Sequence, residues 1–262
     1  MALFWCGYAL PIFAQWVFTK PVEEWRSCRS RKRDIIVFGA GGPCSCDVQT
    51  FQGTVILVNG EDNPPRVRHP RLVMVGAGGL PIPYGAIEWI NQNLTVYNGP
   101  IKHWAVAYAN SRCVPFRENM AAKLARRVPV HAFGKCTARG KAILKRQAGH
   151  WTSNAVRFRG YAFVLAAEHG IAENYVTEKP FVAAAAGAVP IYQGHSLITE
   201  YMYSDRILFW NATTIDRVVA LLKNGLSKLR ALPSVNKTAL QNIRLKILAA
   251  ERAARHVRGF VR

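Results

Sequence analysis

An α/β fold with mainly parallel sheets is predicted by the order of apolar and amphipathic segments along the chain. Short apolar runs of strand length alternate with segments of helix length, and glycine or proline turns separate them. The runs at 53–59 and 161–167 are apolar almost throughout, which is typical of strands buried on both faces. Strands that alternate with helices pair most simply as a parallel sheet that helices cover on both sides.

The first part of the chain contains three predicted strands, at 34–39, 53–59 and 71–75. A glycine-rich turn follows the first strand, and a glycine and proline turn follows the third. The second strand leads into Gly-Glu-Asp-Asn-Pro-Pro at 60–65, whose prolines exclude a helix. We therefore expect an extended loop that carries two acidic side chains.

The second part of the chain repeats the alternation of strands and helices. Its clearest local signal is the segment 180–187, in which Pro180 suits a first helical turn and Gly187 suits a left-handed helix end. The alanines between them favour the helix. The remaining pattern predicts strands at 104–108, 128–133, 161–167 and 188–192, and helices at 118–127, 141–147, 215–229 and 237–257.

No charged residue occurs between Ala2 and Thr19, a run just long enough for a membrane helix, which needs about 17–25 residues. Pro11 and Gln15 interrupt the run, and a cluster of arginine and lysine at 26–33 follows it. Two interpretations stay open, a membrane anchor and an incomplete or buried N-terminal segment. The predicted domains are a candidate membrane anchor with a basic linker at 1–33, an N-terminal lobe at 34–103 and a C-terminal lobe at 104–262.

The chain of 262 residues is strongly basic, with 35 Lys and Arg against 15 Asp and Glu, and its net charge is +20. Half of its residues are hydrophobic, which excludes a disordered chain. The charge favours an anionic partner, which could be a nucleotide diphosphate, a membrane, an acidic protein or nucleic acid. The sequence shows no pattern of interleaved basic and aromatic recognition residues, so we expect no nucleic-acid partner.

The six cysteines lack the paired spacing of a structural zinc site. They can be ordinary buried thiols, or they can form one or two disulfides in an oxidising compartment. The sequence also lacks an Asp-x-Asp motif and any pair of histidines on one helix face. We therefore predict no metal site and no resident cofactor.

The loop at 168–179 occupies the functional position of the second part, because ligands bind beyond the carboxyl ends of parallel strands. A helix that begins near Pro180 offers free backbone N–H groups, and Lys179 adds a full positive charge, so a diphosphate would be stabilised there. Arg117 begins the preceding helix and can bind a phosphate oxygen. The alternatives are that Glu178 only complements the helix dipole, that Lys179 is solvated, and that Arg117 forms a surface ion pair with Glu118 or another acid.

Three ordered blocks in this half form a longer signature. They are Tyr-Ala-Phe-Val-Leu-Ala-Ala-Glu-His at 161–169, Asn-Tyr-Val-Thr-Glu-Lys at 174–179 and Ala-Gly-Ala-Val-Pro-Ile-Tyr-Gln-Gly at 186–194. Together they resemble the donor-site signature of the alpha-1,3-fucosyltransferases, glycosyltransferase family 10. The segments 109–117 and 128–136 look like the preceding block of the same family, so the resemblance covers roughly residues 104–211.

The resemblance implies a GT-B fold, with two Rossmann-like lobes of which the N-terminal one is compressed here. The acceptor would bind the N-terminal lobe, and the C-terminal lobe would hold GDP-fucose as the donor substrate. Fucose would be transferred with inversion to an N-acetylglucosamine-containing glycan in alpha-1,3 linkage, on the lumenal side of the Golgi membrane in a eukaryote. By the family pattern, Arg117, Tyr175 and Lys179 would contact the diphosphate, and Glu178 would hold hydroxyls of the donor sugar.

The catalytic base implied by the resemblance is Glu61, with Asp62 in reserve, because residues 58–64 look like the short acidic loop of the family. The alternative is a solvated acidic loop. His169 stands where the family usually has Asn, which would alter a donor hydrogen bond and make it sensitive to pH.

The rival functions are a family member that binds nucleotide without turnover, a GT-B enzyme for another nucleotide sugar, and a basic nucleic-acid-binding protein.

Overall fold

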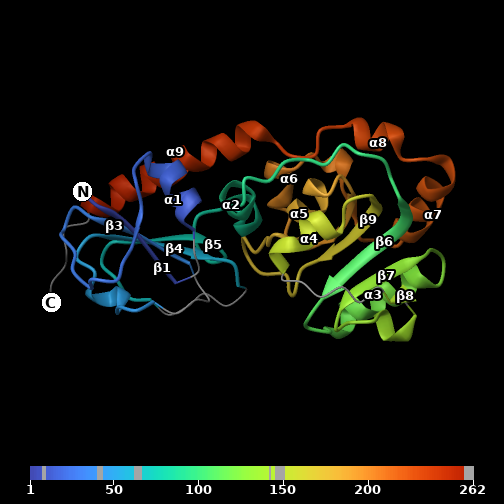
Figure 1. Cartoon of the computed structure of the whole chain (residues 1–262), viewed down its shortest axis with the longest axis horizontal. Helices are drawn as coiled ribbons and strands as arrows, with labels where there is room; N and C mark the ends of the chain where they lie inside the picture. The colour runs from blue at the N-terminus through green and yellow to red at the C-terminus, as the bar shows by residue number, and fades with distance from the viewer. Residues whose placement is uncertain (8–9, 40–43, 62–66, 142, 145–150, 257–262) are drawn as a thin grey trace.

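The chain folds into two α/β lobes that lie next to each other along the long axis of the molecule (Figure 1). Each lobe is built around one parallel sheet, as the sequence predicts. The computed structural model describes residues 1–7, 10–39, 44–61, 67–141, 143–144 and 151–256.

The described N-terminal sheet has five strands in the order β2-β1-β3-β4-β5, and all of its strand pairs are parallel. The three strands expected from the sequence are β3, β4 and β5. The elements of this lobe are β1 (Leu3–Gly7), α1 (Pro11–Phe18), β2 (Glu23–Glu24), β3 (Ile35–Gly39), η1 (Val48–Thr50), β4 (Thr54–Asn59), β5 (Leu72–Gly76) and α2 (Tyr84–Asn91).

The first uncharged segment of the chain is a strand and a short helix of this lobe, instead of one continuous apolar helix. β1 lies between β2 and β3, and α1 begins at Pro11, which suits a first helical turn. Phe13 and Val17 of α1 are buried in the core over the sheet. Among the described residues, no helix combines the length and the apolar character that crossing a bilayer requires.

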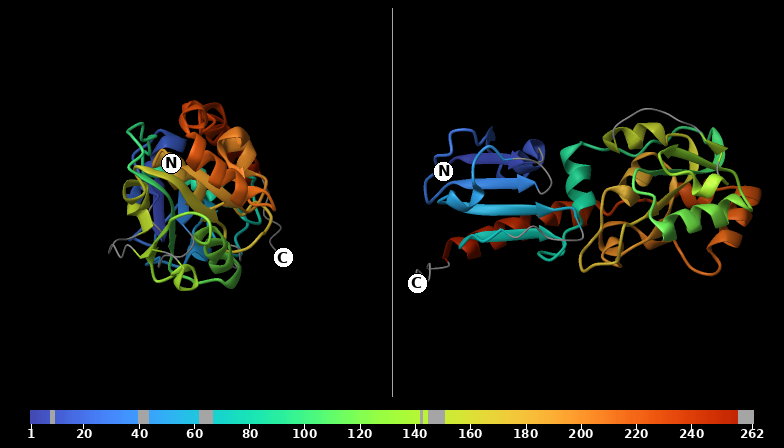
Figure 2. Two further views of the ribbon diagram at one scale, coloured as in Figure 1. Left: turned by 90° about the vertical axis from the view of Figure 1, so that its right-hand side faces the viewer. Right: turned by 90° about the horizontal axis from the view of Figure 1, so that it is seen from below.

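The described C-terminal sheet has six strands in the order β11-β10-β9-β6-β7-β8, again with parallel pairing. Helices cover both of its faces (Figures 1 and 2). Its strands are β6 (His103–Asn110), β7 (Val130–Gly134), β8 (Ile143–Leu144), β9 (Tyr161–Ala167), β10 (Val189–Gln193) and β11 (Leu208–Phe209). Its helices are α3 (Pro115–Ala125), η2 (Ala138–Gly140), η3 (Trp151–Ser153), α4 (Asn154–Arg157), α5 (Lys179–Ala185), α6 (Ile198–Tyr201), η4 (Ser204–Arg206), α7 (Thr214–Asn224) and α8 (Ser227–Ala231).

Two helices differ from the sequence-based expectation. The helix expected at 141–147 is not formed in its described part, where β8 pairs with β7 at the sheet edge; residues 145–147 lie outside the described chain. The helix expected at 215–229 is two helices, α7 and α8, because Gly225 between them has a φ of +90° that a continuous helix cannot contain.

The last helix, α9 (Lys237–His256), returns to the N-terminal lobe, although the predicted domain boundary assigned its residues to the C-terminal lobe. Figure 1 shows it running from the C-terminal lobe along the N-terminal sheet. Its buried Ile243 and Ile247 share a core with Val58 of β4 and Val75 of β5. The apolar spacing of the helix predicts a buried face, but that spacing does not say which lobe the face covers.

All six cysteines form disulfides, so they are not free buried thiols, and the chain has three disulfides where the sequence predicted at most two. Cys6–Cys44 and Cys28–Cys46 lie in the N-terminal lobe, and Cys113–Cys136 lies in the C-terminal lobe. The last one joins the loop after β6 to the loop after β7. It therefore constrains the edge of the C-terminal sheet at which ligands are expected.

The two lobes are joined by direct contacts between α2 with its preceding loop and the C-terminal lobe. Asn174 Nδ2 donates to the carbonyl of Gly79 at 3.1 Å, and the Gly85 N–H donates to the carbonyl of Val176 at 3.3 Å. A Cβ at Gly85 would lie only 2.1 Å from the Thr177 carbonyl oxygen, so this approach requires glycine. The loop before α5 is thus held against the N-terminal lobe.

Candidate functional site

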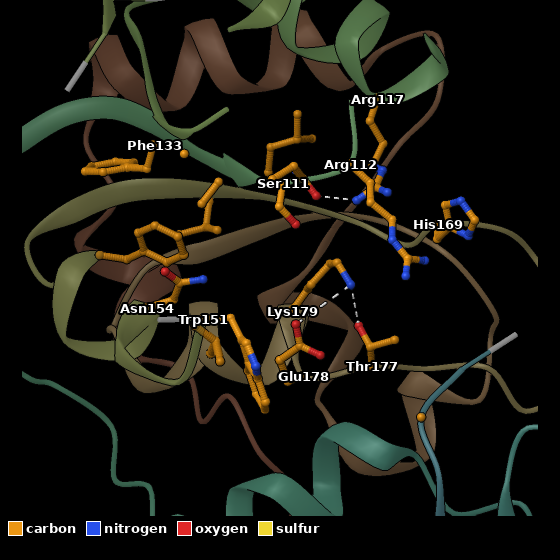
Figure 3. A pocket seen from close by; sticks show the side chains of 18 of the residues that line it. Ser111, Arg112, Arg117, Phe133, Trp151, Asn154, His169, Thr177, Glu178 and Lys179 are labelled. Atoms are coloured by element: carbon orange, nitrogen blue, oxygen red, sulfur yellow. Dashed lines mark hydrogen bonds and ion pairs between the residues drawn. The ribbon is translucent and has the colours of Figure 1, made fainter. Parts of the chain in front are cut away.

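A cavity of about 610 Å³ lies between the lobes, at the carboxyl ends of strands from both sheets. Its walls include Asn110 at the end of β6, Gly134 at the end of β7 and Gly60 just after β4. This is the edge at which parallel sheets bind ligands. Figure 3 shows the side chains that converge on it, with Glu178 and Lys179 on one side and Arg112 and Arg117 on the other.

A buried carboxylate fixes one wall of the cavity. Glu168 directly follows β9 and is 1% exposed. Its Oε1 accepts the Thr177 N–H at 2.8 Å, and its Oε2 accepts the Thr177 hydroxyl at 2.6 Å. Lys179 Nζ donates to the same Oε2 at 3.3 Å and to the Thr177 Oγ1 at 2.8 Å. The three side chains form one network that holds the lysine ammonium group in place.

The charges of this network act on one another. Burial alone would lower the pKa of Lys179, but the carboxylates of Glu178 and Glu168 outweigh it and raise that pKa above its usual value. Burial raises the pKa of Glu168, while the nearby Lys179 ammonium and the Thr177 hydrogen bonds oppose the change. Lys179 therefore stays protonated and places a positive charge at the cavity wall.

Arg117 supplies a second cation from the first turn of α3. It is 3% exposed, and its Nη1 donates to the Asn110 side-chain oxygen. Its Nε is buried and has no hydrogen-bond partner. Burial lowers the pKa of this guanidinium. The alternative ion pair with Glu118 is not formed, because the Glu118 carboxylate accepts the Tyr108 hydroxyl and the Arg139 N–H. A buried arginine with an unused donor fits an anionic ligand.

Three further residues of the predicted donor site line the same cavity: Tyr175, Glu178 and His169. Tyr175 is buried in the loop before α5. Glu178 stands at the N-cap of α5 without a side-chain cap hydrogen bond, and its Oε1 lies 3.8 Å from Lys179 Nζ. The structure therefore brings together every residue that the sequence assigned to the C-terminal part of the site.

Glu61 belongs to the opposite wall, which the N-terminal lobe provides. It follows β4 and is exposed. Asn59 holds its backbone, because the Glu61 N–H donates to Asn59 Oδ1 at 3.1 Å and Asn59 Nδ2 donates back to the Glu61 carbonyl at 3.0 Å. The side chain is thus a solvent-accessible carboxylate that faces the cavity from a fixed loop end. The reserve candidate Asp62 lies outside the described residues.

The sequence assigned no site role to several residues that shape the cavity, although four of them lie in the blocks 109–117, 128–136 and 161–169. Asn110 and Arg112 follow from the end of β6, where a ligand-binding position could have been expected. A second group comes from the segment before β9, where the sequence predicts no element and gives no signal. The residues without an assigned role are Tyr84, Asn110, Arg112, Phe133, Trp151, Asn154, Arg157 and Glu168, of which the last touches the cavity through Lys179.

In the part of the chain that the structure describes, no three His, Cys, Asp or Glu side chains are grouped so that they could hold a metal ion. The cavity wall instead offers two fixed cations, and its opposite side offers a carboxylate. Such a site can bind a diphosphate and place a base across from it.

Residues 100–207 match the family pattern described as "Glycosyltransferase family 10 (fucosyltransferase) C-term". The match contains the buried strand β9, the loop with Thr177 and Lys179, and Arg117. It ends before α7.

Curated relatives are similar to the same region. An alpha-(1,4)-fucosyltransferase of Arabidopsis thaliana is 34% identical over 110 residues, which are 37% of this chain and 27% of the relative. The human GDP-fucose protein O-fucosyltransferase 3 is 30% identical over 107 residues, which are 38% of this chain and 22% of that protein. The matched region thus spans about a quarter of each relative.

Solved structures are similar over both lobes. An alpha1,3-fucosyltransferase crystal structure covers 97% of this chain and 90% of its own, with a TM-score of 0.65 and 15% identity. The same kind of enzyme with GDP-fucose gives a TM-score of 0.61 at 14% identity and covers 98% and 90%. A DNA-modifying beta-glucosyltransferase gives 0.58 at 13% identity and covers 98% and 99%. These likenesses show the GT-B fold. Residues 100–207 are thus similar to the C-terminal part of glycosyltransferase family 10 (fucosyltransferase), and the whole chain is similar in fold to solved GT-B glycosyltransferases.

Proposed function

We propose that the protein transfers fucose from GDP-fucose to an N-acetylglucosamine-containing glycan, with inversion and in alpha-1,3 linkage. One observation carries the proposal: Lys179 and Arg117, held by different elements, line the same cavity as Glu61 of the opposite lobe. The match of residues 100–207 to the family pattern and the likeness to an alpha1,3-fucosyltransferase with GDP-fucose support the choice of donor.

The donor diphosphate is placed against the cations of the C-terminal lobe. Lys179 is oriented by Glu168 and Thr177, and Arg117 is oriented by Asn110. When the bond between fucose C1 and the diphosphate oxygen breaks, negative charge develops on the GDP oxygens. Fixed cations lower the energy of that charge because they need no reorganisation during the reaction. Tyr175 and Glu178 line the space for the rest of the donor.

The acceptor hydroxyl is activated from the N-terminal lobe. Glu61 takes the hydroxyl proton as the acceptor oxygen bonds to fucose C1 from the face opposite the departing GDP. One C–O bond forms while one breaks, the proton moves to Glu61, and GDP leaves with the electron pair. A single displacement of this kind inverts the configuration at C1. The opposite placement of Glu61 and the two cations suits this geometry.

The site of action that we propose is the lumenal side of the Golgi membrane, in protein glycosylation. Disulfides persist in oxidising compartments, and the chain has three of them. This supports a secretory location.

The test is transfer of labelled fucose from GDP-fucose to a panel of lactosamine and N-acetylglucosamine-terminated acceptors, with the product linkage assigned by NMR. We expect an alpha-1,3-linked product from the wild type and from Lys223→Ala, which removes an exposed lysine of α7. An alpha-1,4-linked product would overturn the linkage. GDP binding without any transfer would favour a member that only binds nucleotide, and transfer from a different nucleotide sugar alone would overturn the donor.

A further inference from the structure

A second cavity, of about 560 Å³, lies at the opposite edge of the C-terminal sheet. Trp104, the second residue of β6, lines it, whereas Asn110 at the other end of the same strand lines the donor-site cavity. Gly187, which precedes β10, and Gly225, which precedes α8, are also in its wall. The two cavities are therefore separated by the length of a strand.

A deeply buried arginine without enough partners lines this cavity. Arg206 is 2% exposed, and its Nη2 donates to the Gly187 carbonyl at 3.3 Å. Its Nε and Nη1 are buried and have no hydrogen-bond partner. Buried donors in native proteins are nearly always bonded, and an unsatisfied one is costly, more so when it is charged. Two buried donors of this arginine therefore lack an acceptor.

A second arginine stands beside the first. Arg230 is half-buried, and it donates from Nε to the Gly187 carbonyl at 2.9 Å and from Nη2 to the Gly99 carbonyl at 3.0 Å. Two guanidinium groups thus share one carbonyl oxygen. No carboxylate of the described residues forms an ion pair with either of them. The pair is an uncompensated double positive charge at a cavity wall.

The two charges are present at neutral pH. Burial, together with repulsion from Arg230, lowers the pKa of Arg206 to about 10. That value still lies well above neutrality, so Arg206 remains a cation. An anion in this cavity would neutralise both groups, and guanidinium groups bind oxyanions with two parallel hydrogen bonds.

Aromatic side chains, one of them well exposed, also line this cavity. Trp104 is 48% exposed although it is large and apolar, and Tyr97 and Ile101 line the cavity next to it. An accessible indole beside a charged group offers a flat surface on which a ring can pack. The cavity thus combines a position for an oxyanion with a position for the ring that carries it.

We propose that this cavity binds a saccharide that carries a phosphate or sulfate ester, with the ester on Arg206 and Arg230 and the sugar ring on Trp104. The site is distinct from the donor site and does not depend on the proposed transfer reaction. Phosphate and sulfate esters share the chemistry that two arginines recognise. Which of them binds is therefore decided by the probes.

The test is calorimetric titration at constant ionic strength with N-acetylglucosamine 6-sulfate, N-acetylglucosamine 6-phosphate, unmodified N-acetylglucosamine and inorganic sulfate. We expect saturable binding of at least one ester and none of the unmodified sugar. Arg230→Gln should weaken ester binding roughly tenfold or more. Trp104→Ala should reduce the preference for the ester over inorganic sulfate. Arg217→Gln, which removes an exposed arginine of α7, should bind as the wild type does.

Two controls keep the result specific. Lys179→Ala must retain ester binding, because otherwise the ester occupies the donor-site cavity and the proposal is wrong. Arg206→Met must lose it, and circular dichroism must show that each variant is folded. Equal binding by Arg230→Gln and Arg217→Gln, or the absence of saturable binding to the wild type, would overturn the second site. The relative affinity of the two esters identifies the preferred group.

Discussion

The ammonium nitrogen of Lys179 lies 3.3 Å from Oε2 of Glu168, a carboxylate that is almost completely buried at the end of β9. Thr177 bridges the two side chains, since its hydroxyl donates to the carboxylate and accepts from the lysine. The buried carboxylate therefore positions a cation at the cavity wall. This relationship connects the end of the sheet, where Glu168 follows β9, to the wall on which we propose that an anionic leaving group binds.

Removal of the positioned cation should weaken nucleotide binding. Lys179→Ala deletes an ammonium group, and hydrogen bonds to charged groups contribute about 1.5–3 kcal/mol, which is on the order of a 10- to 100-fold loss of GDP affinity. Calorimetric titration with GDP measures the change. Lys223→Ala is the matched control, because it removes the same charge from an exposed position on α7. Equal affinities of the two variants would show that Lys179 does not contact the diphosphate.

The role of Glu168 is positioning, and a double-mutant cycle can separate it from direct contact. Glu168→Gln removes the charge that orients Lys179, so GDP affinity should fall, but only while the lysine is present. In the Lys179→Ala background the same substitution should change GDP affinity little, which gives a coupling energy on the order of 1 kcal/mol or more. Additive effects in the cycle would argue that Glu168 acts on binding by another route, such as loss of local structure.

The contribution of Glu88 to the stability of the protein should fall as pH rises through the range in which this carboxyl ionises. This α2 carboxylate is 1% exposed, and burial raises its pKa above the ordinary value of 4.5, against the hydrogen bonds from Gln92 and Tyr84. The folded state then binds the proton more tightly than the unfolded state does, so ionisation from about pH 4.5 upward costs stability.

Glu88→Gln tests this effect, because the amide cannot ionise. The difference in unfolding free energy between wild type and variant should decline as pH rises above about 4.5, and thermal denaturation between pH 4 and 8 measures it. Glu173→Gln, an exposed substitution, serves as the reference. A difference that stays flat or rises with pH would show that burial does not control this carboxyl.

The disulfide Cys113–Cys136 should support both stability and nucleotide binding. It closes a loop with a sequence separation of 23 and lies at the carboxyl edge of the C-terminal sheet. Its first cysteine, Cys113, is four positions before Arg117 in the sequence. Its replacement by serines should lower the unfolding free energy by about 2–4 kcal/mol. GDP affinity should fall as well, because the loops around Arg117 lose a constraint.

The N-terminal disulfide Cys28–Cys46 provides the control for this prediction. Its removal should also destabilise the protein, but it should leave GDP affinity unchanged once the measurement is made well below the unfolding temperature. Denaturant unfolding and GDP titration on both double-serine variants give the comparison. A loss of GDP affinity in the N-terminal variant alone would contradict the assigned role of Cys113–Cys136.

The alternation of strands and helices was predictable because buried parallel strands leave apolar runs with turn residues after them. The predicted strands of both sheets are confirmed, including those that end at Asn59 and Ala167. The segment that contains β1 and α1 was less clear. Its apolar residues show neither helical nor strand periodicity. Such a run is compatible with a membrane helix as well as with a buried strand and a short helix.

The candidate site was predictable only in part. Lys179 and Arg117 were found because they precede or begin helices at the functional edge of the sheet. The pairing of Lys179 with Glu168 was not predicted from the sequence, because it depends on the fold of the loop between them. Trp151 and Asn154 gave no signal, because they reach the cavity from a segment without a clear period. The position of α9 on the N-terminal lobe likewise depends on tertiary packing.

In the proposed mechanism, the cations of one lobe hold the leaving group while Glu61 of the other lobe acts as the base. Fucose transfer by Glu61→Gln, measured together with GDP-fucose affinity, tests this division of roles. We expect turnover to fall on the order of 100-fold or more, the usual contribution of a general base, with unchanged donor affinity. Turnover close to that of the wild type, with intact donor binding, would contradict it.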